Sequence, residues 1–321
     1  MSVVLNDYMK EIMNCIKEKR KLSDSSANQY MMTLIKLNGG KPFTNLSWTK
    51  KYDVVQAIID TYAPSTKLTQ YAVLTSALSC YATKPTYRSA YTYWHNKMTL
   101  TVEDRRKIPI HEKSEKQEDN MIPWEEVQKK KLELKEVLSS YPLTKHTLTV
   151  KEYNNIVDYV LLSLYTDIAP RRNKDYLEMY IVKSGGKVAD NTKNYYDMTT
   201  HKFHFNNYKT AKKYGQQDVD VPPALQEVIN MYVKVHPLAK GRWKEIKMLV
   251  KNDGTPLDQV NAITRRLNKL FGKKIGSSML RHIFLSDKFG KETQEREQVA
   301  EQMGHSVAQQ SEYIKLDKPK N

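Results

Sequence analysis

Apolar side chains in the first hundred residues recur at the three- and four-residue spacing of amphipathic helices. One such stripe begins after Ser23 or Asp24, and either residue can cap a helix. Its apolar members are Ala27, Tyr30, Met31, Leu34 and Ile35. A second stripe begins near Ser65, and its apolar members are Tyr71, Leu74, Leu78 and Tyr81. The sequence therefore predicts a helical N-terminal domain.

Charged residues replace this apolar pattern after residue 102. Residues 103–119 carry 11 charged side chains and no apolar period, so we expect an exposed linker there. Residues 124–138 return to helical spacing and predict a short amphipathic helix. The chain thus divides into a helical domain (1–102), a charged linker with a short helix (103–144) and a C-terminal domain (145–321).

The C-terminal domain mixes helical spacing with short alternating segments. Helices are expected at residues 150–165, 223–232, 260–271, 279–289 and 292–303. Strands are expected at residues 179–182, 195–196, 202–205 and 218–221. The last two strands flank a polar segment that contains Gly215, which is typical of a β-hairpin. The predicted fold is mainly α, with a small antiparallel β-sheet in the C-terminal domain.

The charge balance points to a polyanionic partner. The chain has 52 Lys and Arg against 36 Asp and Glu, a formal net charge of +16. Such an excess attracts nucleic acid through its long-range field and through counterion release. The basic residues are scattered, with no gathering beside an apolar helix face, so a membrane surface is the less favoured partner. No run of 18 apolar residues exists to span a membrane.

The N-terminal residues and the cysteines indicate the cellular compartment in which the protein is expected. Asp7 and Lys10 interrupt the N-terminal apolar residues too early for a signal peptide, which predicts an intracellular protein. Only two cysteines occur, Cys15 and Cys80. Two cysteines fit a reducing compartment and cannot form a metal site alone, so we expect neither a disulfide scaffold nor a cysteine metal centre.

Four polar segments stand out in the C-terminal part of the chain. They are residues 170–177 (PRRNKDYL), 208–210 (YKT), 278–282 (SMLRH) and 303–306 (MGHS), the last followed by Tyr313. Each segment alone is ordinary, because arginines at a helix end, an exposed lysine or a tyrosine near the C-terminus most often serve solubility or packing. Their order and spacing together carry the information.

That order resembles the catalytic set of the tyrosine recombinases, the phage-integrase family. The family's motifs are Arg-x-x-Glu/Asp, a hairpin Lys-Thr, Leu-Arg-His, and Leu-Gly-His-Ser followed by the tyrosine. The matching residues here are Arg172, Asp175, Lys209, Thr210, Leu280, Arg281, His282, Gly304, His305, Ser306 and Tyr313. The resemblance covers about residues 145–316. Within the family, the sequence most resembles the divergent members that large eukaryotic DNA viruses and mobile elements carry.

The resemblance implies an architecture and an activity. The N-terminal helices resemble the family's core-binding domain, so a two-domain clamp around DNA is expected. The implied enzyme is a site-specific recombinase or integrase. It cuts and rejoins double-stranded DNA through a 3′-phosphotyrosine bond, without a metal ion, a small-molecule cofactor or ATP. A homotetramer on two duplexes is the implied assembly.

The resemblance also assigns roles that suit the chemistry. Arg172 and Arg281 would hold the non-bridging oxygens of the anionic transition state, because guanidinium forks stay charged and bind bidentately. His305 would add a third donor. Tyr313 would be the nucleophile, and Lys209 would protonate the leaving 5′-hydroxyl. The supporting residues are Arg171, Ser278 and His282.

Several points stay open in the sequence. Arg171 competes with Arg172, and Lys212 and Lys213 lie near enough to be mistaken for Lys209. The first position of the family's His-x-x-Arg is Ser278, which can donate a hydrogen bond but cannot carry charge, so a slower enzyme is implied. The spacing from His305 to the tyrosine is one residue shorter than in the family. Phosphate contacts are expected from Arg265, Arg266, Lys273 and Lys274.

Two other classes of function fit the same residues. A type IB topoisomerase uses the same Arg, Lys, His and Tyr chemistry as a monomer. A non-catalytic DNA-binding protein of the same fold is the third reading, supported by Ser278, and it predicts no covalent adduct. His282 is expected to be buried beside the site in any of these. The sequence indicates neither the target site nor whether the tyrosine acts within its own subunit.

Overall fold

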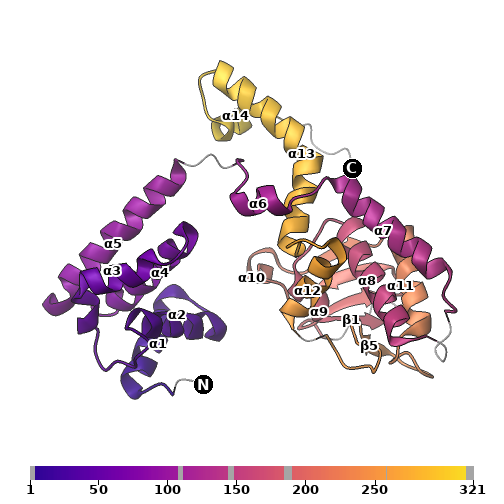
Figure 1. Ribbon diagram of the computed structural model, residues 1–321, viewed down its shortest axis with the longest axis horizontal. Coiled ribbons are helices and arrows are strands. Elements are labelled where there is room, and N and C mark those ends of the chain that lie inside the picture. The colour runs from indigo at the N-terminus through magenta and orange to yellow at the C-terminus, as the bar shows by residue number, and fades with distance from the viewer. Residues whose placement is uncertain (1–3, 108–110, 144–147, 184–189, 258, 316–321) are drawn as a thin grey trace. The chain divides into compact units, whose positions relative to one another are not determined.

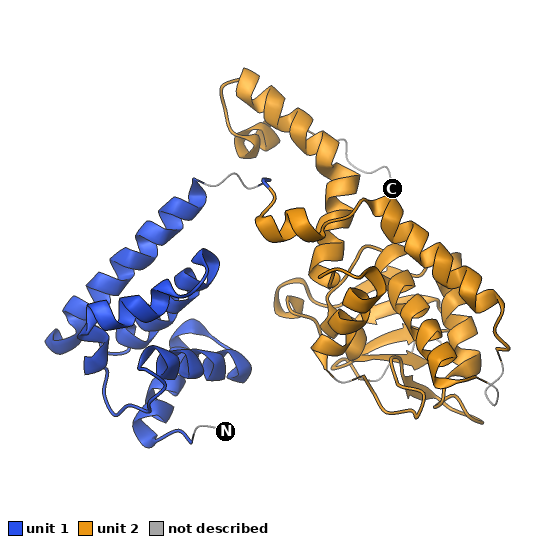
Figure 2. Ribbon diagram, viewed as in Figure 1, with its two compact units in different colours: residues 1–112 blue, residues 113–321 orange. Residues whose placement is uncertain are grey.

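The computed structural model divides into two compact units, residues 1–112 and 113–321 (Figure 2). It describes residues 4–107, 111–143, 148–183, 190–257 and 259–315. The chain is mainly helical, as predicted, with one small sheet in the second unit (Figure 1).

Unit 1 consists of helices. They are α1 (Asp7–Arg20), α2 (Asp24–Leu37), the 3-10 helix η1 (Ser47–Lys50), α3 (Tyr52–Asp60), α4 (Pro64–Ser79) and α5 (Pro85–Arg106). Ser23 caps α2, as expected, by accepting a hydrogen bond from the Ser26 backbone N–H. The apolar stripes meet around Trp94, which is fully buried and donates its indole N–H to the Thr49 carbonyl at 2.9 Å. α5 extends to Arg106 and so includes the start of the segment predicted as linker.

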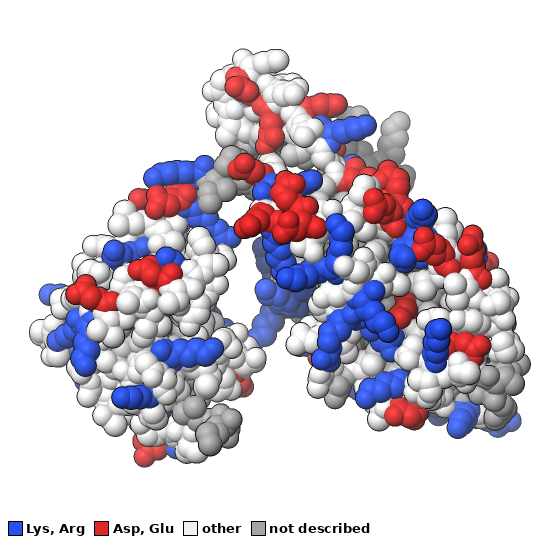
Figure 3. Space-filling view, in the orientation of Figure 1, with Lys and Arg blue, Asp and Glu red and all other residues white. Residues whose placement is uncertain are grey.

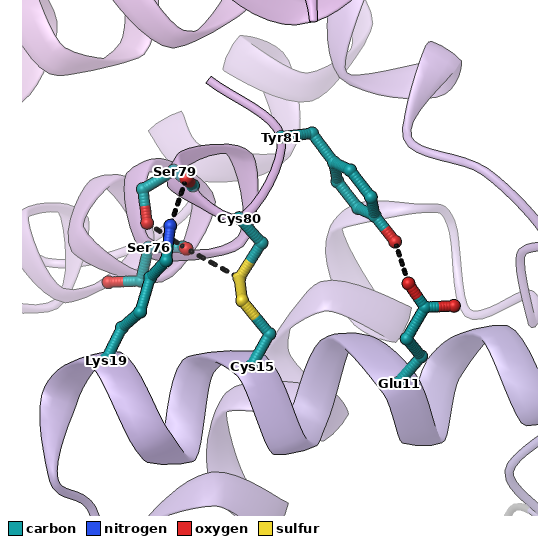
Figure 4. Close-up of a disulfide and its surroundings, with 7 residues drawn as sticks. All are labelled: Glu11, Cys15, Lys19, Ser76, Ser79, Cys80 and Tyr81. Atoms are coloured by element: carbon teal, nitrogen blue, oxygen red, sulfur yellow. Dashed lines mark hydrogen bonds between the residues drawn. A yellow bond between two sulfur atoms is a disulfide. The ribbon is translucent and has the colours of Figure 1, made fainter. Parts of the chain in front are cut away.

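A disulfide bond joins Cys15 of α1 to Cys80 at the end of α4 (Figure 4). The expectation of two reduced thiols is therefore wrong. The sequence separation of 65 hid the pairing, because only the packing of α1 against α4 brings the two Cα atoms within 6.2 Å. Lys19 Nζ also bonds the Ser79 carbonyl, and Tyr81 donates its hydroxyl hydrogen to Glu11, so three links tie α1 to this end of α4.

Reducing this disulfide should lower the stability of unit 1. Opening a 65-residue loop restores conformational entropy to the unfolded chain, and disulfides of this kind contribute about 2–4 kcal/mol. Thermal unfolding of the whole chain, with and without reductant, measures the effect. The Cys15→Ser variant is the control, since its melting temperature should already be low and should not respond to reductant. Equal melting temperatures for oxidised and reduced wild type would contradict the expected contribution.

Unit 2 builds a mixed sheet within a shell of helices. Its strands are β1 (Met179–Val182), β2 (Asn194–Asp197), β3 (Lys202–Phe205), β4 (Gln217–Asp220) and β5 (Glu245–Lys247), in the order β4-β3-β2-β1-β5. β3 and β4 form the predicted antiparallel hairpin. β1 and β2 are parallel, so the prediction of a purely antiparallel sheet is wrong. β5 was not predicted, because three residues are too few to establish an alternating pattern.

The longer helices of unit 2 agree with the sequence except at the C-terminal end, whereas the short helices α6, α9, α10 and α14 were not predicted. They are α6 (Glu115–Asn120), α7 (Trp124–Ser139), α8 (Val150–Thr166), α9 (Asn173–Leu177), α10 (Ala211–Tyr214), α11 (Pro223–Val235), α12 (Val260–Phe271), α13 (Ser277–Gln302) and α14 (Val307–Tyr313). α8 is buried along most of its length in the core of the unit. α6 lies within the segment predicted as an exposed linker. α7 contributes Val127 and Leu138 to the core of this unit.

One continuous helix, α13, replaces the two helices predicted at residues 279–289 and 292–303. Gly290 falls between the two predicted ranges, but it lies in the helix interior and no other atom crowds its position. A glycine there costs about 0.5–1 kcal/mol relative to alanine, which weakens a helix without ending it. The result is a 26-residue helix that leaves the body of unit 2 and carries α14 at its far end (Figure 1).

Candidate active site

Residues from three of the four polar segments line one open pocket in unit 2, with a volume of about 250 Å³. Its walls come from the start of α9, the connection between β3 and β4, and the first turns of α13. The lining residues are Pro170, Arg171, Arg172, Asp175, Tyr208, Thr210, Tyr214, Gln217 and Arg281. Arg172 and Arg281, remote in sequence, thus share one pocket. We call it the arginine pocket.

Arg171 is held inside the protein. Its Nε bonds Asp175 Oδ2 at 3.0 Å, and its Nη1 bonds Gln217 Oε1 at 3.0 Å. The guanidinium also lies 3.7 Å from the ring centre of Phe205. Arg172 makes no such side-chain bond within the described residues, although it lines the same pocket. The structure therefore leaves Arg172, of the two, available to a ligand, and it gives Arg171 the bond to Asp175.

Asp175 balances part of the pocket's positive charge. Its side chain is almost fully buried, and burial raises its pKa against the opposing effect of Arg171 and then Arg172. Oδ1 of Asp175 has no hydrogen-bond partner among the described residues. The carboxyl group thus bonds the Arg171 side chain, whereas it interacts with the Arg172 side chain through charge without a hydrogen bond to it.

Lys209 sits at the edge of the arginine pocket. It is exposed and lies between Tyr208 and Thr210, which both line the pocket. The buried Tyr208 fixes this connection by donating its hydroxyl hydrogen to the Gly215 carbonyl at 2.7 Å. Gly215 has φ of 68°, a conformation that favours glycine. Lys209, Lys212 and Lys213 are all outside the lining of the pocket, and Lys209 differs only in that both of its chain neighbours line it.

Of the three expected site residues in the first turns of α13, only one lines the arginine pocket. Arg281 faces the pocket, whereas Ser278 is exposed and does not line it. His282 is exposed too, so its expected burial beside the site is wrong. It follows Arg281 on the helix by one position, about 100° around the axis, which turns it away from the buried face.

His305 and Tyr313 lie away from the arginine pocket. The straight helix between Arg281 and Gln302 spans about 30 Å at 1.5 Å per residue, and both residues come after its end. Their rings approach each other, with centres 5.8 Å apart. Nε2 of His305 is buried and has no partner among the described residues, and Tyr313 is 63% exposed. The predicted set is therefore split into a pocket group and a remote pair.

The basic residues expected to contact phosphate differ in their surroundings. Arg266 bonds Asp158 at 2.7 Å and Asn154 at 2.6 Å, which links α12 to α8, and its expected phosphate contact stays a prediction. Arg265 is exposed, with one long contact to Gln259. Lys273 and Lys274 are exposed as well, and Lys273 Nζ reaches the Asp119 carbonyl at 3.2 Å.

Replacing Arg266 by alanine should destabilise the protein, whereas Arg265→Ala should not. Burial raises the pKa of Asp158, against the pairing with Arg266, so removing the arginine leaves a carboxylate that is costly to ionise. For this partly exposed pair we expect a loss of about 2 kcal/mol. A raised pKa means that stability falls as pH rises, so the deficit should shrink as pH is lowered and Asp158 becomes protonated.

Urea unfolding at several pH values measures this difference, with Arg265→Ala as the matched variant on the same helix. Arg265→Ala should keep wild-type stability but weaken DNA binding and reduce its salt dependence by about one counterion. Equal stability of the two variants would contradict the structural role of Arg266.

Tyr214 is a pocket residue that sequence reasoning missed. It lies at the end of α10, is 58% exposed, and lines the pocket with Arg172 and Arg281. Lys213 Nζ lies 5.0 Å from the centre of its ring. No signal in the sequence marked it, because its position depends on the short helix between β3 and β4. Its phenol is a rival to Tyr313 as a nucleophile and needs its own control.

A second, larger pocket lies between α7, α8 and α11, with a volume of about 380 Å³. Its lining is mostly apolar, with Lys131, Lys135 and Glu227 as its charged residues and no arginine among the described residues. Lys131 is paired with Asp167. A phosphodiester needs fixed positive charge around its oxygens. The arginine pocket provides that charge, so we place the candidate site there.

Comparison with known proteins adds no further assignment. No family model matches the chain, and no curated protein matches it. Among the described residues, no helix is both long and apolar enough to cross a membrane. Over the same residues, no three His, Cys, Asp or Glu side chains gather in a way that could hold a metal ion. A functional assignment therefore rests on the polar segments and on the pocket they form.

Proposed function

We propose that the protein cuts and rejoins double-stranded DNA through a 3′-phosphotyrosine intermediate, as a site-specific recombinase of the tyrosine type. One observation carries the proposal. Arg172 and Arg281 come from separate segments yet line a single pocket, and Lys209 stands at its edge. Two guanidinium groups without side-chain hydrogen bonds among the described residues suit a phosphodiester in a pocket of this size.

The proposed reaction follows from the pocket's charges. Arg172 and Arg281 bind the non-bridging oxygens of the scissile phosphate and stabilise the charge that builds up on them. The phenolic oxygen of Tyr313 attacks phosphorus, and its proton passes to water, to which the side chain is exposed. The bond from phosphorus to the 5′-oxygen breaks, and Lys209 gives that oxygen a proton. Religation reverses these steps, so the phosphotyrosine conserves the energy of the original bond.

The surface charge supports DNA as the substrate. Lys and Arg side chains gather over the part of unit 2 that holds α9, α10 and α12 (Figure 3). The net charge of +16 adds a long-range attraction for the duplex. Exposed Arg265, Lys273 and Lys274 would contact backbone phosphates around the pocket without reading sequence. In this proposal four copies act on two duplexes, with unit 1 clamping the DNA.

A suicide-substrate assay tests the proposal. Purified protein is mixed with nicked, labelled duplexes in EDTA and without ATP, and covalent adducts are separated on denaturing gels. The proposal predicts an adduct with wild type. If DNA binds but no adduct forms, the protein is a DNA-binding protein without cleavage activity. If an adduct forms and supercoiled plasmid is relaxed, with no joining of two duplexes, the protein is a type IB topoisomerase.

A non-catalytic DNA-binding function is the second candidate, and a specific observation favours it. Tyr313 lies on α14, which folds back onto α13 beside Arg296, roughly 20 Å along the helix from Arg281 at 1.5 Å per residue. Ser278, at the position of a family histidine, is exposed and outside the pocket. A protein that bound DNA without cutting it would need neither residue near the arginines. The adduct assay separates the two candidates directly.

A further inference from the structure

Three asparagines lie together at the start of the connection between β3 and β4. We define the lysine connection as residues 206–216, which contain Lys209 and α10. Asn206 and Asn207 begin it, and Asn194 is the first residue of the neighbouring strand β2. Asn194 is completely buried, although asparagine usually lies at the protein surface. A buried amide is costly unless its donors and its acceptor are paired, so its bonds indicate what it holds in place.

The amide of Asn194 makes four hydrogen bonds. Its Nδ2 donates to the backbone carbonyls of Asp175 and Asn207, both at 2.9 Å. Its Oδ1 accepts from the backbone N–H groups of Asn206 and Asn207, at 2.9 and 2.8 Å. One side chain therefore joins the first two residues of the lysine connection to α9, the helix that directly follows Arg172.

The other two asparagines extend this contact. Asn206 Nδ2 donates to the Lys193 carbonyl at 2.9 Å, and Asn207 Nδ2 donates to Glu178 Oε2 at 2.7 Å. Lys193 directly precedes β2, and Glu178 directly follows α9. We call Asn194, Asn206 and Asn207 the asparagine cluster. The cluster thus bonds the start of the lysine connection to both β2 and α9.

The far end of the lysine connection is bonded to the same region. Gln217, the first residue of β4, accepts a hydrogen bond from Arg171 at 3.0 Å. Arg171 also bonds the side chain of Asp175, whose backbone carbonyl accepts from Asn194. Both ends of the connection that carries Lys209 are therefore anchored at or beside α9.

The side chain of Lys209 depends on this anchoring for its position. It is exposed, and no hydrogen bond or ion pair holds it among the described residues. A proton donor must come within about 2.6–3.2 Å of the atom that it protonates. A displacement of about 1 Å at such a site can cost roughly 10²-fold in rate. Asn207 is two residues before Lys209, so the asparagine cluster fixes where the lysine backbone lies.

We propose that the asparagine cluster positions Lys209 at the leaving 5′-oxygen. This is a positioning role, since the fully buried amide of Asn194 touches neither DNA nor the reacting atoms. The inference rests on the proposed phosphotyrosine chemistry and names the residues on which its proton transfer depends. Without the cluster, the arginine pocket still binds the phosphate, but the lysine no longer reaches the oxygen that must leave.

A duplex with sulfur in place of the leaving 5′-oxygen tests this role. A thiolate is a much weaker base than an alkoxide, so it leaves without taking a proton. Single-turnover rates are compared on the ordinary and the sulfur duplex. Lys209→Ala should slow cleavage of the ordinary duplex by about 10²–10⁴-fold and cleave the sulfur duplex close to the wild-type rate. Asn194→Asp should behave likewise, with a loss of about 10²-fold on the ordinary duplex.

Two variants of the cluster are compared because they disturb it to different degrees. Asn194→Asp keeps the size of the side chain and the acceptor for two backbone N–H groups, but as a carboxylate it loses both N–H donors. Asn207→Ala removes one side-chain bond, to Glu178, from a half-buried residue. It should slow the ordinary duplex less than Asn194→Asp does and recover on the sulfur duplex. Melting temperatures show whether each variant is folded under the assay conditions.

Two controls separate positioning from loss of stability and from loss of phosphate binding. Tyr153→Phe removes a buried hydrogen bond to Tyr232, between α8 and α11. It should lower the melting temperature without slowing cleavage of either duplex. Arg172→Ala should be slow on both duplexes, because sulfur in the leaving group does not replace a guanidinium at the non-bridging oxygens.

Recovery of both asparagine variants on the sulfur duplex, together with Lys209→Ala, is the expected result. The positioning role is wrong if folded asparagine variants stay slow on sulfur or cleave the ordinary duplex normally. If Asn194→Asp does not fold, Asn207→Ala decides by the same comparison. If Lys209→Ala itself stays slow on sulfur, Lys209 is not the acid and has no proton transfer to position. Wild type that forms no adduct on either duplex would instead refute the proposed function.

Discussion

Tyr313→Phe is expected to abolish the covalent protein–DNA adduct and to leave DNA affinity and thermal stability unchanged. The substitution removes only the phenolic oxygen, which is the proposed nucleophile. Tyr313 is 63% exposed, and no hydrogen bond of its hydroxyl occurs among the described residues, so folding should not depend on that oxygen. Adduct yield, measured with affinity by gel shift and melting temperature, separates loss of chemistry from loss of structure.

Tyr214→Phe is the matched control for this prediction. Tyr214 is similarly exposed, at 58%, and already lines the arginine pocket. If Tyr313 is the nucleophile, Tyr214→Phe should still form the adduct. The reverse pattern, with the adduct lost in Tyr214→Phe and retained in Tyr313→Phe, would place the nucleophile on the connection between β3 and β4. α14 would then have no part in the chemistry.

Arg281→Ala and Arg172→Ala should each slow cleavage by about 10²–10³-fold, the effect of removing one preorganised donor at a developing anionic charge. Neither arginine has a side-chain bond among the described residues that would be left broken, so melting temperatures should stay close to wild type. Single-turnover cleavage at saturating protein isolates the chemical step from DNA binding. A normal cleavage rate in both variants would exclude the arginine pocket as the active site.

Arg171→Ala tests the choice between the two neighbouring arginines. Arg171 pairs with the buried Asp175 and stacks on Phe205, so its loss should destabilise the protein by about 2–4 kcal/mol. Cleavage per folded molecule should fall far less than in Arg172→Ala. The opposite result would be that Arg171→Ala loses cleavage but stays stable, while Arg172→Ala cleaves normally. Arg171 would then be the arginine that binds the scissile phosphate.

Local sequence pattern predicted most of the elements that position the site. α12 and strands β1 and β3 begin and end where the spacing indicated, and Ser23 caps α2 as expected. These features depend on periodicity and capping, which lie within a few residues of each other in the chain. The pairing of β3 with β4 is equally local, since a short polar segment with Gly215 joins them.

Features that depend on distant residues escaped prediction. The Cys15–Cys80 bond follows from packing of α1 against α4, and the parallel pairing of β1 with β2 follows from the path between them. The sequence pattern also predicted two helices, at residues 279–289 and 292–303, where the structure has the single helix α13. That difference separates His305 and Tyr313 from the arginines, and it changes the expected site from one group to two.

Mapping the residue that carries DNA in wild-type protein tests the central claim most directly. The adduct formed on a suicide substrate is digested with protease and nuclease, and the peptide that retains a nucleotide is sequenced by mass spectrometry. The account predicts a single modified peptide with phosphate esterified to Tyr313. A nucleotide on Tyr214 or on any other residue, or no adduct from protein that binds the same DNA, would contradict it.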